Sequence, residues 1–233
     1  MNKINWKKIG FEFLSIFIAV ISAFALSNWN ENRREAEAAN KILAEIANGL
    51  EKDIEDVRVN MRGHKEGINA CDFWRDLIND EINEIVDTFM FVQHYFDLTR
   101  DYISIQNISG YETLKSKGLE LIEDDSLRYE IITLYEFDYN VVKKFEEEYQ
   151  EMQYHKSYFK EINKQLAPSF KFDQEGGLTG INLPLGLNEK DKNILLSYLW
   201  KIKVNRNFII RYYSQTEQKL MDLHKKIETK LNQ

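Results

Sequence analysis

The chain has 233 residues, of which 30% are charged and 13% are aromatic, and its formal net charge is −7. This composition excludes a disordered chain and a chain wholly embedded in a membrane. The acidic balance argues against a nucleic-acid surface, which needs clustered Lys and Arg. Cys71 is the only cysteine, which excludes an internal disulfide and a cysteine-built zinc site.

Residues 1–9 form a basic tail, and residues 10–29 are predicted to form a transmembrane helix. The only charged residue in that helix is Glu12. Trp6 and Trp29 bracket the apolar run at roughly 35 Å, close to the thickness of a bilayer with its interfaces, so both are predicted interfacial anchors. The Leu, Ile, Phe and Val side chains favour insertion by roughly 3–6 kcal/mol, which outweighs the cost of a glutamate near the end of the span.

Two other interpretations compete with a retained anchor. A basic start, an apolar run and the Ala-Phe-Ala pattern at 23–25 resemble a cleavable signal peptide. A buried helix of a soluble protein is the other, although the basic flank and the tryptophan pair argue against it. No Gly or Pro lies between Phe11 and Asn48, so the helix is expected to continue without a break into a charged stalk over residues 30–80.

At 100° per residue, the small and polar residues of the span gather within about 100° of arc. These residues are Glu12, Ser15, Ala19, Ser22 and Ala23. Small residues on one face permit close helix–helix contact in lipid, and a shared face shields an ionisable group from hydrocarbon. We therefore predict association with a second copy, or with another membrane protein, through this face. The simpler alternative is that Glu12 lies at headgroup level and that alanines are common in such helices.

The charges that flank the span are nearly balanced. Lys3, Lys7 and Lys8 precede it, whereas Arg33, Arg34 and Lys41 follow it. A short basic tail is readily retained in the cytoplasm. We therefore expect a single-pass protein of the bacterial inner membrane with a cytoplasmic N-terminus and a periplasmic C-terminal domain.

Residues 81–233 are predicted to form a helical bundle domain against the stalk. Apolar residues recur three or four apart in the stalk at Ile42, Ile46, Leu50, Ile54, Val57 and Met61. Helices are predicted over 82–102, over 109–118 with Ser109 and Gly118 as caps, from a cap at Asp124–Ser126 to Pro168, and from Asn188 to the C-terminus, with a loop at about 168–188. The expected fold is all-α: a transmembrane helix continuing into a stalk helix, packed with a long antiparallel helical hairpin.

The sequence contains no catalytic, cofactor or metal motif that we would assign. His94 with Asp97, and Glu84 with Asp87, share helical faces, but solvated polar positions are the better interpretation. Asp138 and Arg206 interrupt the apolar stripes of their helices. Each could line a ligand pocket or belong to a satisfied ion pair. We therefore predict neither a cofactor nor a metal, and no nucleic-acid partner.

Two blocks carry a resemblance to known proteins. One is Gly10-x-Glu12 followed, after the apolar run, by Asn-Trp-Asn-Glu at 28–31; the other, at 111–122, is Tyr-Glu-Thr-Leu-Lys-Ser, then Gly118 and Leu-Glu-Leu-Ile. They resemble a family of small single-pass bacterial membrane proteins catalogued as a domain of unknown function. The resemblance implies an uncleaved, N-terminally anchored helical protein and supplies no activity. Ala25 stands where such proteins often have glutamine, and that change creates the cleavage-like pattern.

The function expected from these observations is that of a membrane-anchored interaction, scaffold or envelope-associated module without evident catalytic activity. One alternative is an accessory subunit of a channel, motor or transporter complex, with Glu12 in a polar intramembrane path. Another is an enzyme with an unrecognised helical active site, which predicts a deep polar pocket with converging titratable groups. The expected partners are the lipid bilayer and a second copy or another membrane protein.

Overall fold

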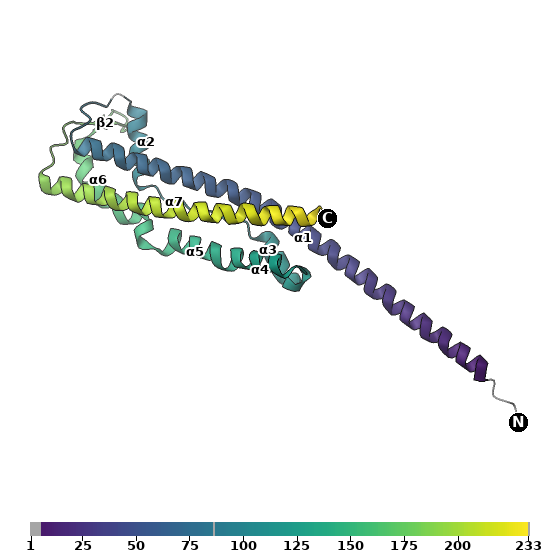
Figure 1. Ribbon diagram of the computed structural model, residues 1–233. Helices are drawn as coiled ribbons and strands as arrows, with labels where there is room; N and C mark the ends of the chain where they lie inside the picture. Colours follow the sequence, from purple (N-terminus) through teal and green to yellow (C-terminus); the bar gives the residue numbers. More distant parts are fainter. Residues whose placement is uncertain (1–5, 86, 233) are drawn as a thin grey trace.

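The computed structural model describes residues 6–85 and 87–232, with side chains from Gly10 onward in those ranges. The described chain is helical apart from connecting segments and one two-stranded hairpin (Figure 1). Helices α1 (Trp6–Ile78) and α7 (Glu189–Leu231) lie side by side, and the shorter helices lie against this pair. The prediction of an all-α fold with a long continuous N-terminal helix is confirmed.

Helix α1 is 73 residues long, which corresponds to about 110 Å of helix. It contains no proline, and it passes from the apolar segment into the stalk without an interruption. Among the side chains that the structure describes, from Gly10 onward, the first buried one in α1 is Ala39. The part before Ala39 therefore projects beyond the bundle as a single helix (Figure 1).

The buried side of α1 follows an alternating four-three spacing, the repeat of helices that supercoil around partners. The buried positions in this repeat are Ala39, Leu43, Ile46, Leu50, Asp53, Val57, Asn60, His64, Gly67, Cys71, Trp74 and Ile78. The predicted apolar stripe shares Ile46, Leu50 and Val57 with this seam. Its other members lie beside the seam, because the seam itself continues through polar residues that an apolar pattern does not detect.

Helix α7 runs antiparallel to α1 and packs principally against it. Lys192 near the start of α7 contacts Asp80 just beyond the end of α1, at 2.9 Å, whereas Glu217 further along α7 contacts Arg58 at 2.5 Å. The predicted cap at Asn188 is confirmed, since its side-chain oxygen accepts a hydrogen bond from the backbone N–H of Asp191 in the first turn of α7. The main partner of this helix is thus the stalk rather than the preceding helical stretch.

The second predicted helix is shorter than expected. Helix α2 spans Thr88–Thr99, and the carboxylate of Asp87 accepts from the backbone N–H of Met90 at 3.0 Å. The residues that follow α2, 100–108, form no regular helix or strand and are called the strap below. The prediction of a helix over 82–102 is therefore wrong at both ends, and the contacts of Arg206 described below explain where the helix stops.

After the strap, α3 (Ser109–Lys117) and the 3₁₀ turn η1 (Leu119–Leu121) lead to the next helix. Gly118 ends α3 with a φ of 108°, which confirms the predicted glycine cap. Ser109 is the first residue of the helix rather than its cap. The predicted cap at Asp124 is confirmed, because its carboxylate accepts from the Leu127 N–H at 3.0 Å.

The long helix predicted from this cap to Pro168 is interrupted. Its parts are α4 (Asp125–Thr133), the π-helical turn η2 (Leu134–Asp138), α5 (Tyr139–Lys143), the π turn η3 (Lys144–Glu148), the 3₁₀ turn η4 (Gln150–Met152), the π turn η5 (His155–Phe159), α6 (Lys160–Leu166) and the 3₁₀ turn η6 (Ala167–Ser169). The break between η3 and η5 has a long-range cause. The carboxylate of Asp101 in the strap accepts from the N–H of Tyr154 at 2.6 Å, where the helix restarts.

The predicted loop at 168–188 contains a short antiparallel hairpin of β1 (Phe170–Phe172) and β2 (Leu178–Ile181). Asp173 closes its turn by accepting from the N–H of Gly177 at 2.7 Å. Gly176 has a φ of 84°, a conformation that suits glycine. The hairpin contacts α2 at the end of the molecule far from the N-terminus (Figure 1).

Two apolar clusters form the core. One joins α1 between Ala39 and Met61 to α3, α4, α5 and the C-terminal half of α7. The other joins α1 between Ala70 and Ile78 to α2, α6, the hairpin and the N-terminal half of α7. The stretch of α1 between the two clusters carries His64, and α7 carries Arg206 at the same level, so that a buried polar layer separates them.

Replacement of Gly67 by alanine tests the packing of this layer. A Cβ atom at Gly67 would lie 2.3 Å from Cζ of the buried Arg206. We expect Gly67→Ala to lower the free energy of unfolding by about 1–3 kcal/mol, as overpacking does, although alanine in a helix interior is normally favoured over glycine by about 1 kcal/mol. Denaturant unfolding monitored by circular dichroism measures the change. Gly10→Ala, where the new Cβ meets nothing within 4 Å, is the matched control; a stability gain at Gly67 would contradict the packing.

Candidate functional site

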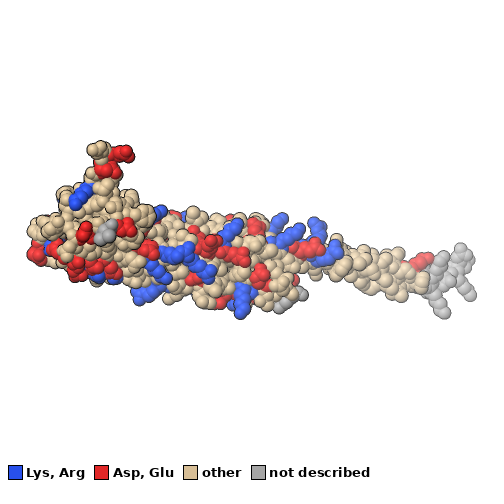
Figure 2. All heavy atoms as spheres, turned by 90° about the horizontal axis from the view of Figure 1, so that it is seen from above, with Lys and Arg blue, Asp and Glu red and all other residues tan. Residues whose placement is uncertain are grey.

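The apolar end of α1 lies uncovered outside the bundle. Every described side chain from Gly10 to Glu37 is exposed, including large ones such as Phe11 at 73%. Figure 2 shows charged side chains over the bundle and the start of the projection, whereas the outer part of the projection is tan apart from one acidic group beside its grey end. By length and composition, this is the one helix of the described chain that is long and apolar enough to cross a membrane.

The five residues predicted to form an association face all lie on this projecting segment and are all exposed. Ser15 donates its hydroxyl to the carbonyl of Phe11 at 2.8 Å, so it is satisfied within its own helix. Of the two predicted anchors, Trp29 is exposed, and the guanidinium of Arg33 lies 5.6 Å from its ring centroid. The side chain of Trp6 lies outside the described residues.

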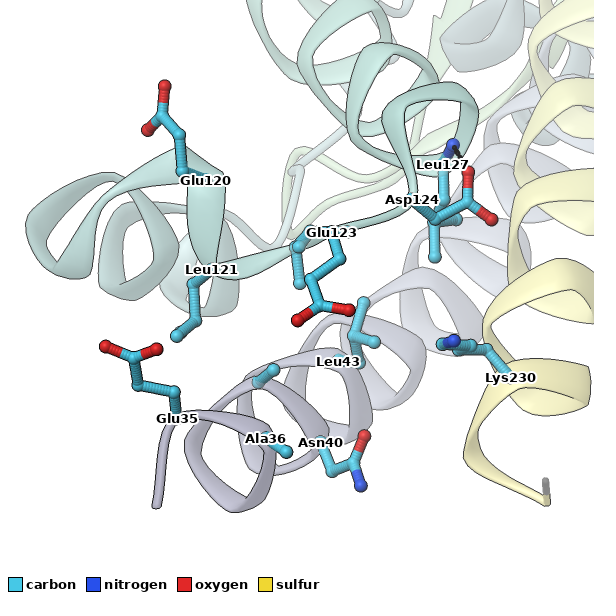
Figure 3. Close-up of a pocket in the computed structure, with 12 residues that line it drawn as sticks. Glu35, Ala36, Asn40, Leu43, Glu120, Leu121, Glu123, Asp124, Leu127 and Lys230 are labelled. Carbon is cyan, nitrogen blue, oxygen red and sulfur yellow. Dashed lines mark hydrogen bonds between the residues drawn. The ribbon is translucent and has the colours of Figure 1, made fainter. Parts of the chain in front are cut away.

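A cavity of about 290 Å³ lies where α1 enters the bundle (Figure 3). Leu43, Leu121 and Leu127 contribute apolar surface, and Lys230 reaches it from α7. Four acidic residues of α1, of η1 and of the segment before α4 line it: Glu35, Glu120, Glu123 and Asp124. Glu120 points away from the cavity in Figure 3, and Asp124 is engaged in capping α4. The lining contains no Ser, Thr, Cys or His, so it offers apolar contact and negative charge rather than a nucleophile.

Arg206 is a fully buried charged side chain. One guanidinium nitrogen, Nη2, donates to the carbonyl oxygens of Asp97, Leu98 and Arg100 at 3.0–3.2 Å. These carbonyls lie at the C-terminal end of α2, where backbone acceptors lack helical partners and where a positive charge is favoured. Arg206 therefore terminates α2, and it explains why the helix does not continue to residue 102.

Aromatic rings and a histidine enclose the same guanidinium. Its Cζ lies 4.1 Å from the ring centroid of Tyr154 and 5.7 Å from that of Tyr102. Nη1 lies 3.1 Å from Nδ1 of His64. Burial, and then the charge of Arg206, lowers the pKa of His64 to about 3. A neutral His64 accepts a hydrogen bond from the arginine, and a protonated ring would place two positive charges together.

Carboxylates hold the strap from two sides. Asp53 and Asp56 of α1 accept from the N–H groups of Asn107, at 2.8 Å, and Ile105, at 3.0 Å. Glu146 accepts from the N–H of Ser104 at 3.2 Å. Tyr139 donates to the carboxylate of Asp53, and Tyr213 donates to that of Glu146. Side-chain carboxylates thus accept from three backbone N–H groups of the strap, in place of the carbonyls of a helix or a sheet.

The remaining sequence candidates have structural roles. Asp138 forms an ion pair with Lys219 at 2.6 Å, as one of its two interpretations predicted. His94 stacks on a phenylalanine, at 4.5 Å between ring centroids. Asp97, expected to be solvated, is buried and accepts from Gln93 at 2.8 Å. Among the described residues, no group of three or more His, Cys, Asp or Glu side chains is placed to hold a metal ion.

No family model, curated protein or solved structure matches the chain.

The burial of His64 leads to a prediction about the stability of the protein in acid. Because the pKa of His64 is lowered to about 3, the folded protein keeps the ring neutral while the unfolded chain takes up a proton below its ordinary pKa of 6.5. The contribution of His64 to the free energy of unfolding is complete above pH 6.5. It is lost as the pH falls towards 3, by about 1.4 kcal/mol per pH unit. Unfolding curves over this range, compared between the wild type and His64→Gln, measure it.

The test compares the pH dependence of stability between the two proteins, because other buried groups change the stability in the opposite direction. Burial raises the pKa of the Asp53, Asp101 and Glu146 carboxyls, so their contribution to stability increases as the pH falls. Both proteins share that contribution. His155→Gln, at an exposed histidine, is the control. Equal pH dependence in the wild type and His64→Gln would contradict the assignment.

Proposed function

We propose that the chain is a single-pass protein of the bacterial inner membrane that holds a helical interaction or scaffold domain at the membrane surface. The observation that carries this proposal is the uncovered apolar length of α1 over residues 10–29. Exposing that surface to water is unfavourable, whereas insertion into a bilayer gains roughly 3–6 kcal/mol. The position of Trp29 at the end of this length, with Arg33 above its ring, supports an interfacial anchor.

The scaffold role is supported by what the buried polar groups contact. Arg206, Asp53 and Glu146 form hydrogen bonds to the backbone of α2 and of the strap. Their chemistry is thus used to position chain segments. The cavity at the base of the bundle adds apolar and acidic surface close to the proposed membrane level, which is suited to binding rather than to bond cleavage.

Self-association through the span is part of the proposal. At 100° per residue, the face containing Glu12, Ser15 and Ala19 points about 150° away from the side of α1 that is buried between Ala39 and Leu50. A second helix at this face would therefore approach from the side opposite to the bundle. The domain leaves room for such a partner, and small residues permit close contact in lipid.

The topology in the proposal has a cytoplasmic N-terminus and a periplasmic domain. A cysteine at the exposed hairpin residue Glu175 tests this topology. The native Cys71 is buried, so it should not react with the labelling reagent. Labelling of intact cells with a membrane-impermeant maleimide is expected for Glu175→Cys. Labelling only after cell lysis would show that the domain is cytoplasmic, and it would leave the proposed anchor in place.

Charge in the span is expected to release the protein from the membrane. Phe17→Arg combined with Ile21→Arg would cost about 5–7 kcal/mol at the centre of the bilayer, at about 2.5–3.5 kcal/mol each, which exceeds the gain from insertion. Alkaline carbonate extraction should leave the wild type in the pellet and bring the variant into the supernatant. Asn30→Arg, beyond the span, is the control and should remain in the pellet. A wild type that is fully extracted would refute the anchor.

A larger side chain on the small face is expected to weaken self-association. Ala19→Leu should lower crosslinking between differently tagged copies in membranes at least several-fold, because it separates the two backbones. Phe13→Leu, on the opposite side of the span, is the matched control. Unchanged crosslinking in Ala19→Leu would remove this face from the proposal while leaving the anchor in place.

A further inference from the structure

The cavity at the base of the bundle has an apolar interior. Leu43 of α1 and Leu127 of α4 are buried in its wall, and the half-buried Leu121 of η1 also lines it. Its volume of about 290 Å³ is roughly twice that of an engineered apolar cavity that binds benzene. The cavity therefore has room for a long side chain, and burial of an aliphatic stem against these leucines is favourable.

The charged groups around this apolar interior are mostly acidic. The lining contains one cation, Lys230, and four acidic residues: Glu35, Glu120, Glu123 and Asp124. In Figure 3, Glu35 extends from α1 toward Leu121, and the carboxylate of Glu123 extends from the segment across the cavity toward Leu43. A cation that lies between Glu35 and Glu123 is thus attracted from two sides.

Several neighbouring cations do not neutralise these carboxylates, because each is paired elsewhere or lies on another face. The pairs are Arg33–Glu37 at 3.6 Å, Arg128–Asp125, and Lys226–Glu130 at 2.6 Å. At 100° per residue, Arg34 and Lys41 point about 170° away from the middle of the α1 residues that line the cavity. The lining itself, with four acidic residues and one lysine, has a net charge of −3.

Lys230 shows how an aliphatic cation lies in this place. Its side chain leaves α7, and its ammonium points toward the cavity (Figure 3). Lys225 and Lys226 line the adjoining hollow between α7 and the start of α4. These lysines repel a second cation from the α7 side. The acidic side, formed by Glu35 and Glu123, is therefore where a cationic ligand binds.

The cavity lies just outside the proposed bilayer. Its α1 residues run from Glu35 to Leu43, which places them about 9–21 Å beyond Trp29 along the helix. The headgroup layer extends only about 5–8 Å beyond the hydrocarbon on each side of a bilayer. A lipid acyl chain does not reach the cavity, whereas a juxtamembrane segment of a neighbouring membrane protein passes at this height.

We propose that the cavity binds an arginine side chain from a basic, apolar segment of a partner protein held in the same membrane. The proposal rests on the proposed function, because the anchor sets the height at which the partner is met. The aliphatic stem packs against the three leucines, and the guanidinium lies between Glu35 and Glu123. Glu120 points away from the cavity and leaves negative charge beyond it, which favours a segment with further basic residues over a single small cation (Figure 3).

Small analogues of the arginine side chain test the chemistry of the cavity. The full-length protein in phosphatidylcholine nanodiscs is titrated with n-butylguanidinium, and broadening of the NMR signals of this ligand measures binding. We expect roughly five-fold tighter binding than for n-butylurea, which keeps the stem without the charge, or for guanidinium, which keeps the charge without the stem. Empty nanodiscs give the background. Absence of binding, or equal affinity for the three ligands, would overturn the proposal.

Variants test whether the ligand binds in this cavity. Glu35→Gln combined with Glu123→Gln should weaken the binding of n-butylguanidinium roughly five-fold, because the cation loses both carboxylates. Lys230→Gln should strengthen binding, because it removes the repelling ammonium. Glu55→Gln, at an exposed position of α1 outside the lining, is the matched control. Unchanged affinity in the double variant would place the ligand elsewhere and overturn the assignment.

A peptide tests whether the partner is a protein. Acetyl-Leu-Arg-Leu amide should bind at least as tightly as n-butylguanidinium, and citrulline in place of its arginine should weaken it roughly five-fold, because citrulline has no charge. A peptide that does not bind, while n-butylguanidinium does, would make a free organic cation the ligand and overturn the protein partner. Alkaline carbonate extraction of the same protein reports the anchor separately, so a failure of the cavity and a failure of the proposed function are distinguished.

Discussion

The contact between Arg206 and the carbonyl end of α2 is the interaction on which the rest of the domain depends. A buried guanidinium is unfavourable unless its donors are satisfied. Here Nη1 and Nη2 have partners in a histidine ring and three carbonyls, and two aromatic faces lie against the group, whereas the buried Nε has no hydrogen-bond partner. Lysine carries no planar fork and would not reach this set of acceptors in the same way. Because the arginine ends α2, the strap begins there, and Asp101 of the strap in turn fixes the restart of the helix at Tyr154.

The polar layer also sets the positions of the long helices along each other. The apolar seam of α1 against α7 repeats every three or four residues, so sliding by one repeat would still bury apolar side chains. Sliding would, however, remove His64 from Arg206 and Asp53 from the strap, and it would leave buried donors and acceptors unpaired. We infer that the layer specifies register at some cost in stability, a use for which buried polar groups in helical seams are known.

Much of the helical framework follows from local sequence signals. The continuity of α1 follows from the absence of proline throughout the helix and of glycine between Phe11 and Asn48. Asn188, Asp124 and Gly118 mark helix ends through contacts within a few residues. The strap, the interrupted helix and the seam do not follow, because each depends on partners far along the chain: Arg206 lies more than one hundred residues from the carbonyls it binds. A signal was present in the polar residues Asp53, Asn60 and His64, which fit the four-three spacing of a seam otherwise formed by apolar residues. The residues of the span face were visible from sequence, because a step of 100° per residue places them on one side of the predicted helix.

The single helix α1 makes the proposed anchor and the domain one mechanical unit. It contributes to both apolar clusters and to the layer between them, and it leaves the bundle without a hinge residue. Rotation of the proposed span about its axis therefore rotates the exposed side of the whole domain. For this reason, two copies that meet through one face in lipid have little choice of which domain surfaces meet in water. In the proposed dimer, the small residues of the span select the partner and its angle.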